Sequence, residues 1–291
     1  MLVEYPAKIL LLGEYTILHG SKALALPYPH FKGSWSFNEK DSERAMNSRK
    51  ELFTFLEKSG HSYFDSDKLK KDLDSGLWFD SSIPQGFGVG SSGALIAALY
   101  DRYGKSEQGI LEKKKILASL EDHFHGSSSG IDPLVSLLKK PLLIHSFDQI
   151  EVLDNDLELS NFFLIDSEKQ RNTGPLVQIY QEKMKDPEFK LSCANILSKE
   201  VNFAIDDVLK GQNKKDLFHH LWLISKFQWE YFQEMIPTQL KTLWSQGLDS
   251  GDYVLKLCGA GGGGFILGYS LNQATIFQTL DFKSYRIKTL S

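Results

Sequence analysis

The chain has 291 residues, of which 42% are hydrophobic and 24% are charged, so it is long enough for one large or two moderate folded domains with a sizeable core. Its net charge is −4, and the sequence contains no block of basic residues. Both features argue against a nucleic-acid partner.

The first half mixes strands with helices. Short apolar runs punctuated by Gly and Pro predict several strands within residues 1–37, followed by single strands over residues 76–83 and 141–147. Helical spacing of apolar residues predicts amphipathic helices over residues 46–60, 92–103 and 106–123.

The second half has a different order. A strand is predicted over residues 161–167, three or four helices between residues 176 and 246, and strands at YVLKLC, FILGYS and SYRIKTL. Strands followed by helices and again by strands favour an α+β fold over strict βαβ alternation. The composition changes near residues 148–160, which predicts two domains, 1–150 and 151–291.

Two features concern the cell compartment. Cys193 and Cys258 have no metal-type spacing and indicate no disulfide framework, which fits a reducing cytoplasm. The apolar N-terminus is interrupted by charges and has no preceding basic region, so it predicts strands rather than a signal peptide. No run approaches the roughly 18 apolar residues of a membrane span. We therefore expect a soluble cytoplasmic protein with no membrane partner.

The segment QGFGVGSSGALIAALYDRY, residues 85–103, passes abruptly from glycine-rich loop to helix. Gly86, Gly88 and Gly90 would leave backbone N–H groups unobstructed in front of the positive end of a helix, as a phosphate cradle requires. The spacing fits neither a Walker A loop nor the dinucleotide fingerprint. The alternative is an ordinary strand-to-helix turn in which Ser92 is the N-cap.

The segment EDHFHGSSSGIDP, residues 121–133, predicts one carboxylate at a helix end and a second, eleven residues later, on the Gly/Ser loop that follows. Glu121 and Asp132 could serve as a metal ligand and a proton acceptor, although solvated surface charge is the simpler interpretation of this segment alone. His123 and His125 form an HxH pair, but no further His/Cys cluster completes a zinc site.

Two further segments combine glycine or charge with apolar strands. In LCGAGGGGFILGYS, residues 257–270, the glycines indicate a backbone that another group approaches closely, or else a tight strand connection. In PAKILLLGEYTILHG, residues 6–20, Lys8 lies in an apolar strand and needs an anionic partner, and Glu14 follows a glycine at the strand end. Either residue alone is explained by a structural ion pair.

The order of these four segments resembles the three signature motifs of the GHMP kinase superfamily, and residues 121–132 are similar to the acidic loop of its mevalonate kinases. RNTGPLV, residues 171–177, is similar to that family's substrate-side segment. The resemblance implies an N-terminal ribosomal-protein-S5-like domain, a C-terminal ferredoxin-like domain with added helices, and an active site between them. It implies ATP-dependent phosphorylation of a small hydroxylated acid, and it allows a homodimer.

The resemblance also assigns roles. Asp132 would take or orient the proton of the substrate hydroxyl, and Lys8 would neutralise charge beside it. Ser92 and Glu121 would hold Mg²⁺. The residues around the ATP phosphates would be Gly86, Gly88, Gly90, Ser91, Ser92 and Gly93. Those on the substrate side would be Glu14, Tyr15, Phe124, Thr173 and Gly261.

The motifs leave the acceptor open between two acids. The acidic loop favours mevalonate, whereas Tyr15 stands where mevalonate kinases usually have histidine and is similar to phosphomevalonate kinases. Ser127 and Ser128 replace the usual Asn-Pro, and Gly93 replaces a common alanine. A catalytically silent relative that senses ATP and a metabolite is a further alternative. The presence of Lys8, Ser92, Glu121 and Asp132 favours the enzyme, and the kinase-like acidic loop disfavours a decarboxylase.

Overall fold

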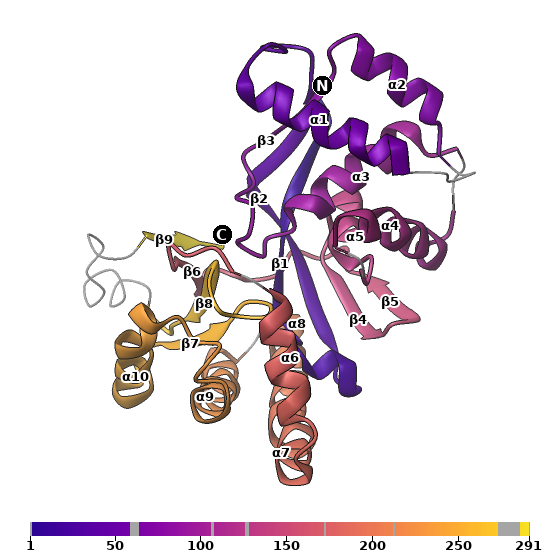
Figure 1. The fold of residues 1–291 in the computed structure, drawn as a ribbon. Coiled ribbons are helices and arrows are strands. Elements are labelled where there is room, and N and C mark those ends of the chain that lie inside the picture. The colour runs from indigo at the N-terminus through magenta and orange to yellow at the C-terminus, as the bar shows by residue number, and fades with distance from the viewer. Residues whose placement is uncertain are drawn as a thin grey trace.

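Two antiparallel sheets with helices packed around them form the fold (Figure 1). The computed structural model describes residues 2–58, 64–105, 108–125, 128–171, 173–211, 213–272 and 286–290. The predicted α+β class is confirmed. No helix in these ranges combines the length and the apolar character that crossing a membrane requires.

The first sheet is built around a long strand, β2 (Ala23–Ser36), which has 14 residues (Figure 1). β2 pairs along one edge with β1 and along the other with β4 near its start and β3 near its end. The strands of this sheet are β1 (Glu4–Leu12), β2 (Ala23–Ser36), β3 (Trp78–Ser81), β4 (Leu142–Ser146) and β5 (Gln149–Val152). Their order is β1-β2-β4-β5, with β3 paired to β2.

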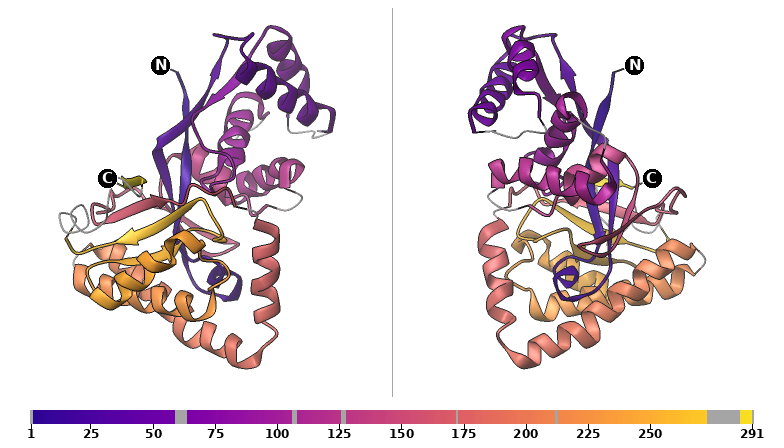
Figure 2. Two further views of the ribbon diagram at one scale, coloured as in Figure 1. Left: turned by 60° about the vertical axis from the view of Figure 1, so that its left-hand side comes forward. Right: turned by 90° about the vertical axis from the view of Figure 1, so that its right-hand side faces the viewer.

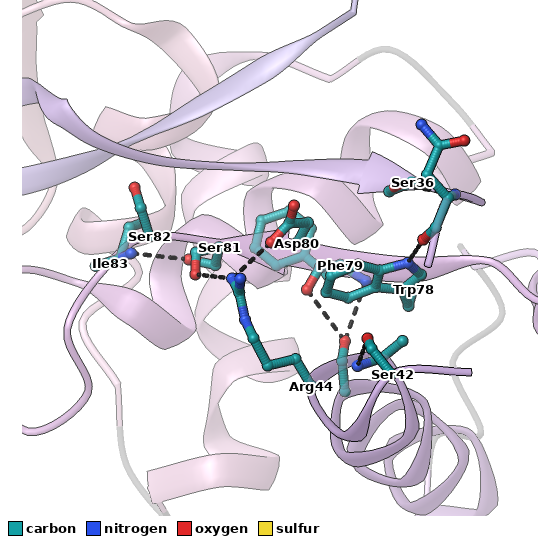
Figure 3. A network of polar contacts seen from close by, with 12 residues as sticks. Ser36, Ser42, Arg44, Trp78, Phe79, Asp80, Ser81, Ser82 and Ile83 are labelled. Atoms are coloured by element: carbon teal, nitrogen blue, oxygen red, sulfur yellow. Dashed lines mark hydrogen bonds and ion pairs between the residues drawn. The ribbon is translucent and has the colours of Figure 1, made fainter. Parts of the chain in front are cut away.

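Helices of the first half lie against this sheet. They are α1 (Glu43–Lys58), α2 (Ser66–Asp74), α3 (Ser91–Tyr103), α4 (Ile110–His125) and α5 (Ile131–Leu138). α3 and α5 pack on each other and on β1 and β2, whereas α1 packs on β3. Polar contacts connect α1 to β3. Arg44 forms an ion pair with Asp80 (Figure 3), and Ser48 forms hydrogen bonds with the backbone of Phe79.

The second sheet has the order β7-β8-β6-β9 and is covered by helices of the second half (Figure 2). Its strands are β6 (Phe162–Asp166), β7 (Val254–Leu257), β8 (Phe265–Tyr269) and β9 (Arg286–Thr289). α9 and α10 pack on β7, while α8 packs on α9 and also reaches β1 and β2. The helical segments are α6 (Thr173–Lys183), α7 (Pro187–Ser192), η2 (Cys193–Leu197), α8 (Ser198–Lys210), α9 (Lys214–Tyr231), η3 (Thr238–Leu240) and α10 (Lys241–Ser250).

Several local predictions were wrong. Residues 14–18 lie in the region predicted to form strands, but the chain leaves β1 before Gly13, turns at residues 14 and 15, and then forms the short helix η1 (Thr16–His19). Gly13 has φ +106°, and an added Cβ would lie 2.3 Å from Cβ of Ala23, so the chain turns sharply there. Asp132, predicted on a loop, lies in the first turn of α5. α2 and β5 were not predicted.

The approach of α3 to α5 positions Asp132. Gly93 is buried inside α3, and an added Cβ would lie 2.9 Å from the carbonyl carbon of Asp132 and 2.9 Å from the nitrogen of Pro133. Both are backbone atoms that cannot rotate away. Glycine at this position therefore lets α3 lie directly against the start of α5.

We expect Gly93→Ala to lower the free energy of unfolding by about 1–2 kcal/mol, because overpacking exceeds the roughly 1 kcal/mol by which alanine favours a helix over glycine. Urea unfolding measures this change. Gly109→Ala is the matched control, since no atom lies within 4 Å of its added Cβ. Equal stability of the Gly93→Ala variant and the wild type would contradict the packing argument.

Candidate active site

The glycine-rich segment between β3 and α3 forms an open backbone loop. Gly86, Gly88 and Gly90 all have left-handed φ angles, of 77°, 73° and 75°. Left-handed residues at alternate positions are typical of backbone concavities that bind anions. Gly90 is the N-cap of α3 and offers no side chain to the first turn. The alternative in which Ser92 is the N-cap is therefore wrong, and α3 begins at Ser91.

Lys8 and Asp132 form an ion pair beside this loop. Nζ of Lys8 lies 2.7 Å from Oδ1 of Asp132, and Lys8 is itself buried. The backbone N–H of Lys8 donates to the carbonyl of Val89 at 2.8 Å, which it can do because β1 is an edge strand. A Cβ added to Gly90 would lie 3.5 Å from Cβ of Lys8 and 3.6 Å from Oδ2 of Asp132. Oδ2 therefore faces the end of the glycine loop.

Glu121, near the end of α4, is buried and bound by two serines. Oγ of Ser92 donates to Oε1 at 2.9 Å, and Oγ of Ser128 donates to Oε2 at 2.5 Å. Burial, followed by the negative charge of Asp132, raises the pKa of Glu121 to about 6, although both serines and Lys8 oppose the rise. Ser92, Glu121 and Asp132 therefore lie close together and interact electrostatically.

Arg171 connects the early and late glycine-rich segments. Its backbone N–H donates to the carbonyl of Gly86 at 2.9 Å, and its Nη1 donates to the carbonyl of Cys258 at 3.0 Å. A Cβ added to Gly88 would lie 2.1 Å from Cζ of Arg171, and one added to Gly259 would lie 2.5 Å from Nη1. Both glycines therefore make room for the guanidinium group.

The late glycine segment lies directly against the glycine-rich loop that precedes α3. A Cβ added to Gly264 would lie 2.3 Å from the carbonyl oxygen of Phe87, a residue of that loop. Gly261, predicted on the substrate side, is instead packed against the backbone of Met235, whose carbonyl oxygen would lie 2.8 Å from an added Cβ. The groups that approach this segment closely are thus largely other parts of the same chain.

Glu14 is neutralised by a lysine of the second sheet. Nζ of Lys256 lies 2.7 Å from Oε1 of Glu14, and the two side chains are 4% and 3% exposed. Burial raises the pKa of Glu14, and Lys256 opposes that rise. Lys256 also donates to the carbonyl of Leu257 at 2.7 Å. The pair ties the end of β1 to β7, so Glu14 fits the structural ion pair that the sequence leaves open.

Tyr15 is buried beside this pair. Its hydroxyl donates to the carbonyl of Ala260 at 2.9 Å, and its ring stacks on Tyr180 at 4.3 Å between centroids. Its φ of 63° is unusual for an aromatic residue and reflects the sharp turn after Gly13. The residue thus orients the late glycine segment through a backbone contact.

Phe124, predicted on the substrate side, packs elsewhere, and the side chain of Thr173 is not described. Phe124 stacks on Phe55 of α1 at 5.9 Å and lines a cavity of about 330 Å³ between α1 and the end of α4, whose other lining residues include His123 and Glu51. Thr173 begins α6, but its side chain lies outside the described residues, as does Ser127.

Three residues of the site were not predicted individually: Ser128, Arg171 and Lys256. Lys256 lies in an apolar strand, which is the same signal that singled out Lys8. Arg171 opens the RNTGPLV segment, and Ser128 lies between the two predicted carboxylates. Their partners lie far away in the chain or across a loop, so the sequence alone does not identify the contacts.

The side-chain atoms near Glu121 that could bind a metal ion are oxygen atoms. In the described parts of the chain, no group of three or more His, Cys, Asp or Glu side chains is arranged to hold a metal ion. Ser92 and Glu121 offer a hydroxyl and a carboxylate, which suit a hard cation such as Mg²⁺ when a ligand supplies the remaining oxygens.

Comparison with known proteins gives consistent relatives. Residues 52–140 match the family described as GHMP kinases N terminal domain. The mevalonate kinase of Pyrococcus furiosus is 23% identical over an alignment of 305 residues that covers 94% of this chain and 90% of that protein. The mevalonate kinase structure of Methanococcus jannaschii has a TM-score of 0.64 at 20% identity and covers 99% of this chain and 96% of that one.

The phosphomevalonate kinase of Streptococcus pneumoniae, in complex with phosphomevalonate and AMPPNP, has a TM-score of 0.67 at 15% identity and covers 99% of both chains. The resemblance to the GHMP kinases that the motifs predict is therefore confirmed, and so is the fold. The fold does not separate the two kinases, since both superpose on this chain to a similar extent.

Protonation of Glu121 should make the free energy of unfolding depend on pH. Its pKa of about 6 in the folded protein exceeds the ordinary value of 4.5, so the folded state binds the proton more tightly than the unfolded chain. We expect the free energy of unfolding of metal-free protein to lose about 2 kcal/mol from this group as pH rises from about 4.5 to above 6. Urea unfolding across this pH range measures the loss. The Glu121→Gln variant should lack this part of the dependence of the free energy of unfolding on pH. The same pH dependence in the variant and the wild type would contradict the prediction.

Removing one charge of the Glu14–Lys256 pair leaves the other buried without a partner. We expect Glu14→Gln or Lys256→Met to destabilise the fold by about 3–5 kcal/mol, and the double variant to lose much less than the sum. Chemical unfolding of the four proteins measures the coupling. Additive losses would contradict the pairing.

Proposed function

We propose that this chain, which shares the fold and the signature motifs of the GHMP kinases, is an ATP-dependent kinase that phosphorylates a hydroxyl group of a small acid, with mevalonate as the acceptor. The observation that carries the proposal is the ion pair between Lys8 and Asp132 at the end of the glycine-rich loop, next to Ser92 and Glu121. These residues combine a proton acceptor, a cation and a phosphate loop, which are the parts that phosphoryl transfer requires.

The geometry supports a division of roles. Asp132 has one carboxylate oxygen held by Lys8, so the other, which faces Gly90, is positioned to accept the proton of the acceptor hydroxyl. Lys8 limits the repulsion between Asp132 and an incoming phosphate. The backbone N–H groups of the glycine loop and of the first turn of α3 would hold the ATP phosphates without moving during the reaction.

Magnesium fits the oxygen donors of this site. Ser92 and Glu121 would hold the ion, and the buried charge of Glu121 is a group that a cation would stabilise. When bound, Mg²⁺ offsets the charge of the transferring phosphate. Ser128 would keep the second carboxylate oxygen of Glu121 oriented, because its hydroxyl already donates to that atom.

Two observations bear on the acceptor. The curated relatives from Pyrococcus furiosus and Archaeoglobus fulgidus, named mevalonate kinases, are both 23% identical to this chain, and this favours mevalonate. Tyr15 favours phosphomevalonate by resemblance, but its hydroxyl is bonded to Ala260, so its role in the fold explains its presence. Mevalonate is therefore the first acceptor to test, and phosphomevalonate is the alternative. A homodimer and a cytoplasmic location remain predictions.

The acceptor is identified by ADP release with Mg-ATP against mevalonate, 5-phosphomevalonate, diphosphomevalonate, homoserine and galactose. We expect turnover with mevalonate. Turnover with phosphomevalonate alone would identify the alternative. ATP binding with no turnover of any compound would favour a sensor over an enzyme.

Asp132→Asn should lower kcat by at least about 100-fold because it removes the proton acceptor, while the affinity for ATP stays within about threefold. Steady-state kinetics and nucleotide titration measure the two effects. Asp80→Asn is the control, since Asp80 is an exposed partner of Arg44 (Figure 3). A kcat of Asp132→Asn within tenfold of wild type would overturn the assignment.

A further inference from the structure

Arg171 differs from the other cations at the junction of the two glycine-rich segments. Lys8 is paired with Asp132, and Lys256 is paired with Glu14. Within the described ranges, the side chain of Arg171 has no carboxylate partner, and its hydrogen bond is to the carbonyl of Cys258. A guanidinium group has five N–H donors, so most of its donor capacity is available to a ligand.

The guanidinium group is held in place by its surroundings. It is partly buried between Gly88 and Gly259, and the backbone of Arg171 is bonded to Gly86. Burial raises the pKa of Tyr15 and the charge of Arg171 opposes that rise, so the guanidinium also lies within electrostatic reach of Tyr15. A positioned arginine with spare donors is suited to a carboxylate, which it can bind through two parallel hydrogen bonds.

The short stretch of chain between Gly88 and Gly90 limits how far Arg171 can lie from Asp132. Gly88 lies against the guanidinium, and Gly90 lies against Asp132. Two residues of chain span at most about 7 Å. An acceptor whose hydroxyl lies at Asp132 can therefore place an acid group, a few carbon atoms away, beside Arg171.

The nucleotide is the less suitable occupant. Its phosphates are served by the backbone N–H groups of the glycine loop and by the start of α3. Arg171 instead approaches the loop from the side of Cys258 and Tyr15. This side is formed by the late glycine segment and by the turn after β1.

We propose that Arg171 binds the carboxylate of the acceptor and so determines that the acceptor must be an acid. This inference rests on the proposed function, because it takes Asp132 as the position of the acceptor hydroxyl. It assigns Arg171 to substrate specificity, and it explains why Gly88 and Gly259 leave space for a guanidinium group at this junction.

The test compares mevalonate with 3-methylpentane-1,3,5-triol, in which the carboxylate is reduced to a neutral alcohol. We expect Arg171→Met to lower kcat/KM for mevalonate by roughly 10- to 100-fold, the range for a lost hydrogen bond to a charged group, and to change that for the triol by less than about threefold. KM for ATP should stay within about threefold. Arg171→Lys should be intermediate because it keeps the charge and loses the planar fork.

The control variant is Arg44→Gln, which removes the same charge from an exposed ion pair on α1 (Figure 3). It should leave the discrimination between the acid and the triol unchanged. An equal loss for both acceptors, or a raised KM for ATP with unchanged discrimination, would overturn the proposal and assign Arg171 to the nucleotide or to packing.

Calorimetric titration of mevalonate into nucleotide-free protein separates this inference from the proposed function. We expect binding to wild type and a loss of at least about tenfold in affinity with Arg171→Met. Arg171-dependent binding without ADP release would uphold the inference while the kinase assignment failed. No binding to wild type, or equal binding to both proteins, would overturn the inference even if turnover were found.

Discussion

The ion pair between Lys8 and Asp132 is the interaction on which the site depends. A lysine buried in a strand is costly unless a carboxylate meets it, and the carboxylate here belongs to a helix more than a hundred residues later. The pair forms because β1 is an edge strand whose backbone binds the glycine-rich loop at Val89, and because Gly93 lets α3 lie directly against the start of α5. The glycine-rich loop, Lys8 and Asp132 are thus held in place relative to one another by contacts within the first half of the chain.

The second buried ion pair, between Glu14 and Lys256, joins the first half of the chain to the second half at the site. Glu14 lies just after β1, and Lys256 lies in β7, so their contact holds the turn after β1 against the late glycine segment. Tyr15 adds a hydrogen bond to Ala260 in the same place. Because the two charges are almost completely buried, this contact resists separation. The turn after β1 and the late glycine segment are therefore held firmly together.

The sequence predicted the local parts of this arrangement well. The α+β class and the helix behind the glycine loop follow from apolar spacing, whereas the grouping of Lys8, Ser92, Glu121 and Asp132 was implied by the resemblance to the GHMP kinases. The turn at Gly13 and the short helix α5 escaped prediction because tertiary contacts decide them. Arg171 and Lys256 escaped for a related reason, since a charge in a strand or loop indicates that it has a partner without indicating which one.

The glycines show most clearly what a sequence pattern leaves undecided. A run of glycines indicates close approach, and the phosphate loop was the obvious reason for it. In the structure Gly93 makes room for Asp132, Gly264 for Phe87, and Gly88 and Gly259 for the guanidinium of Arg171. Only part of the glycine content can therefore be explained by a nucleotide. The remainder accommodates groups of the protein itself, among them Asp132, which is paired with Lys8, and the guanidinium group of Arg171.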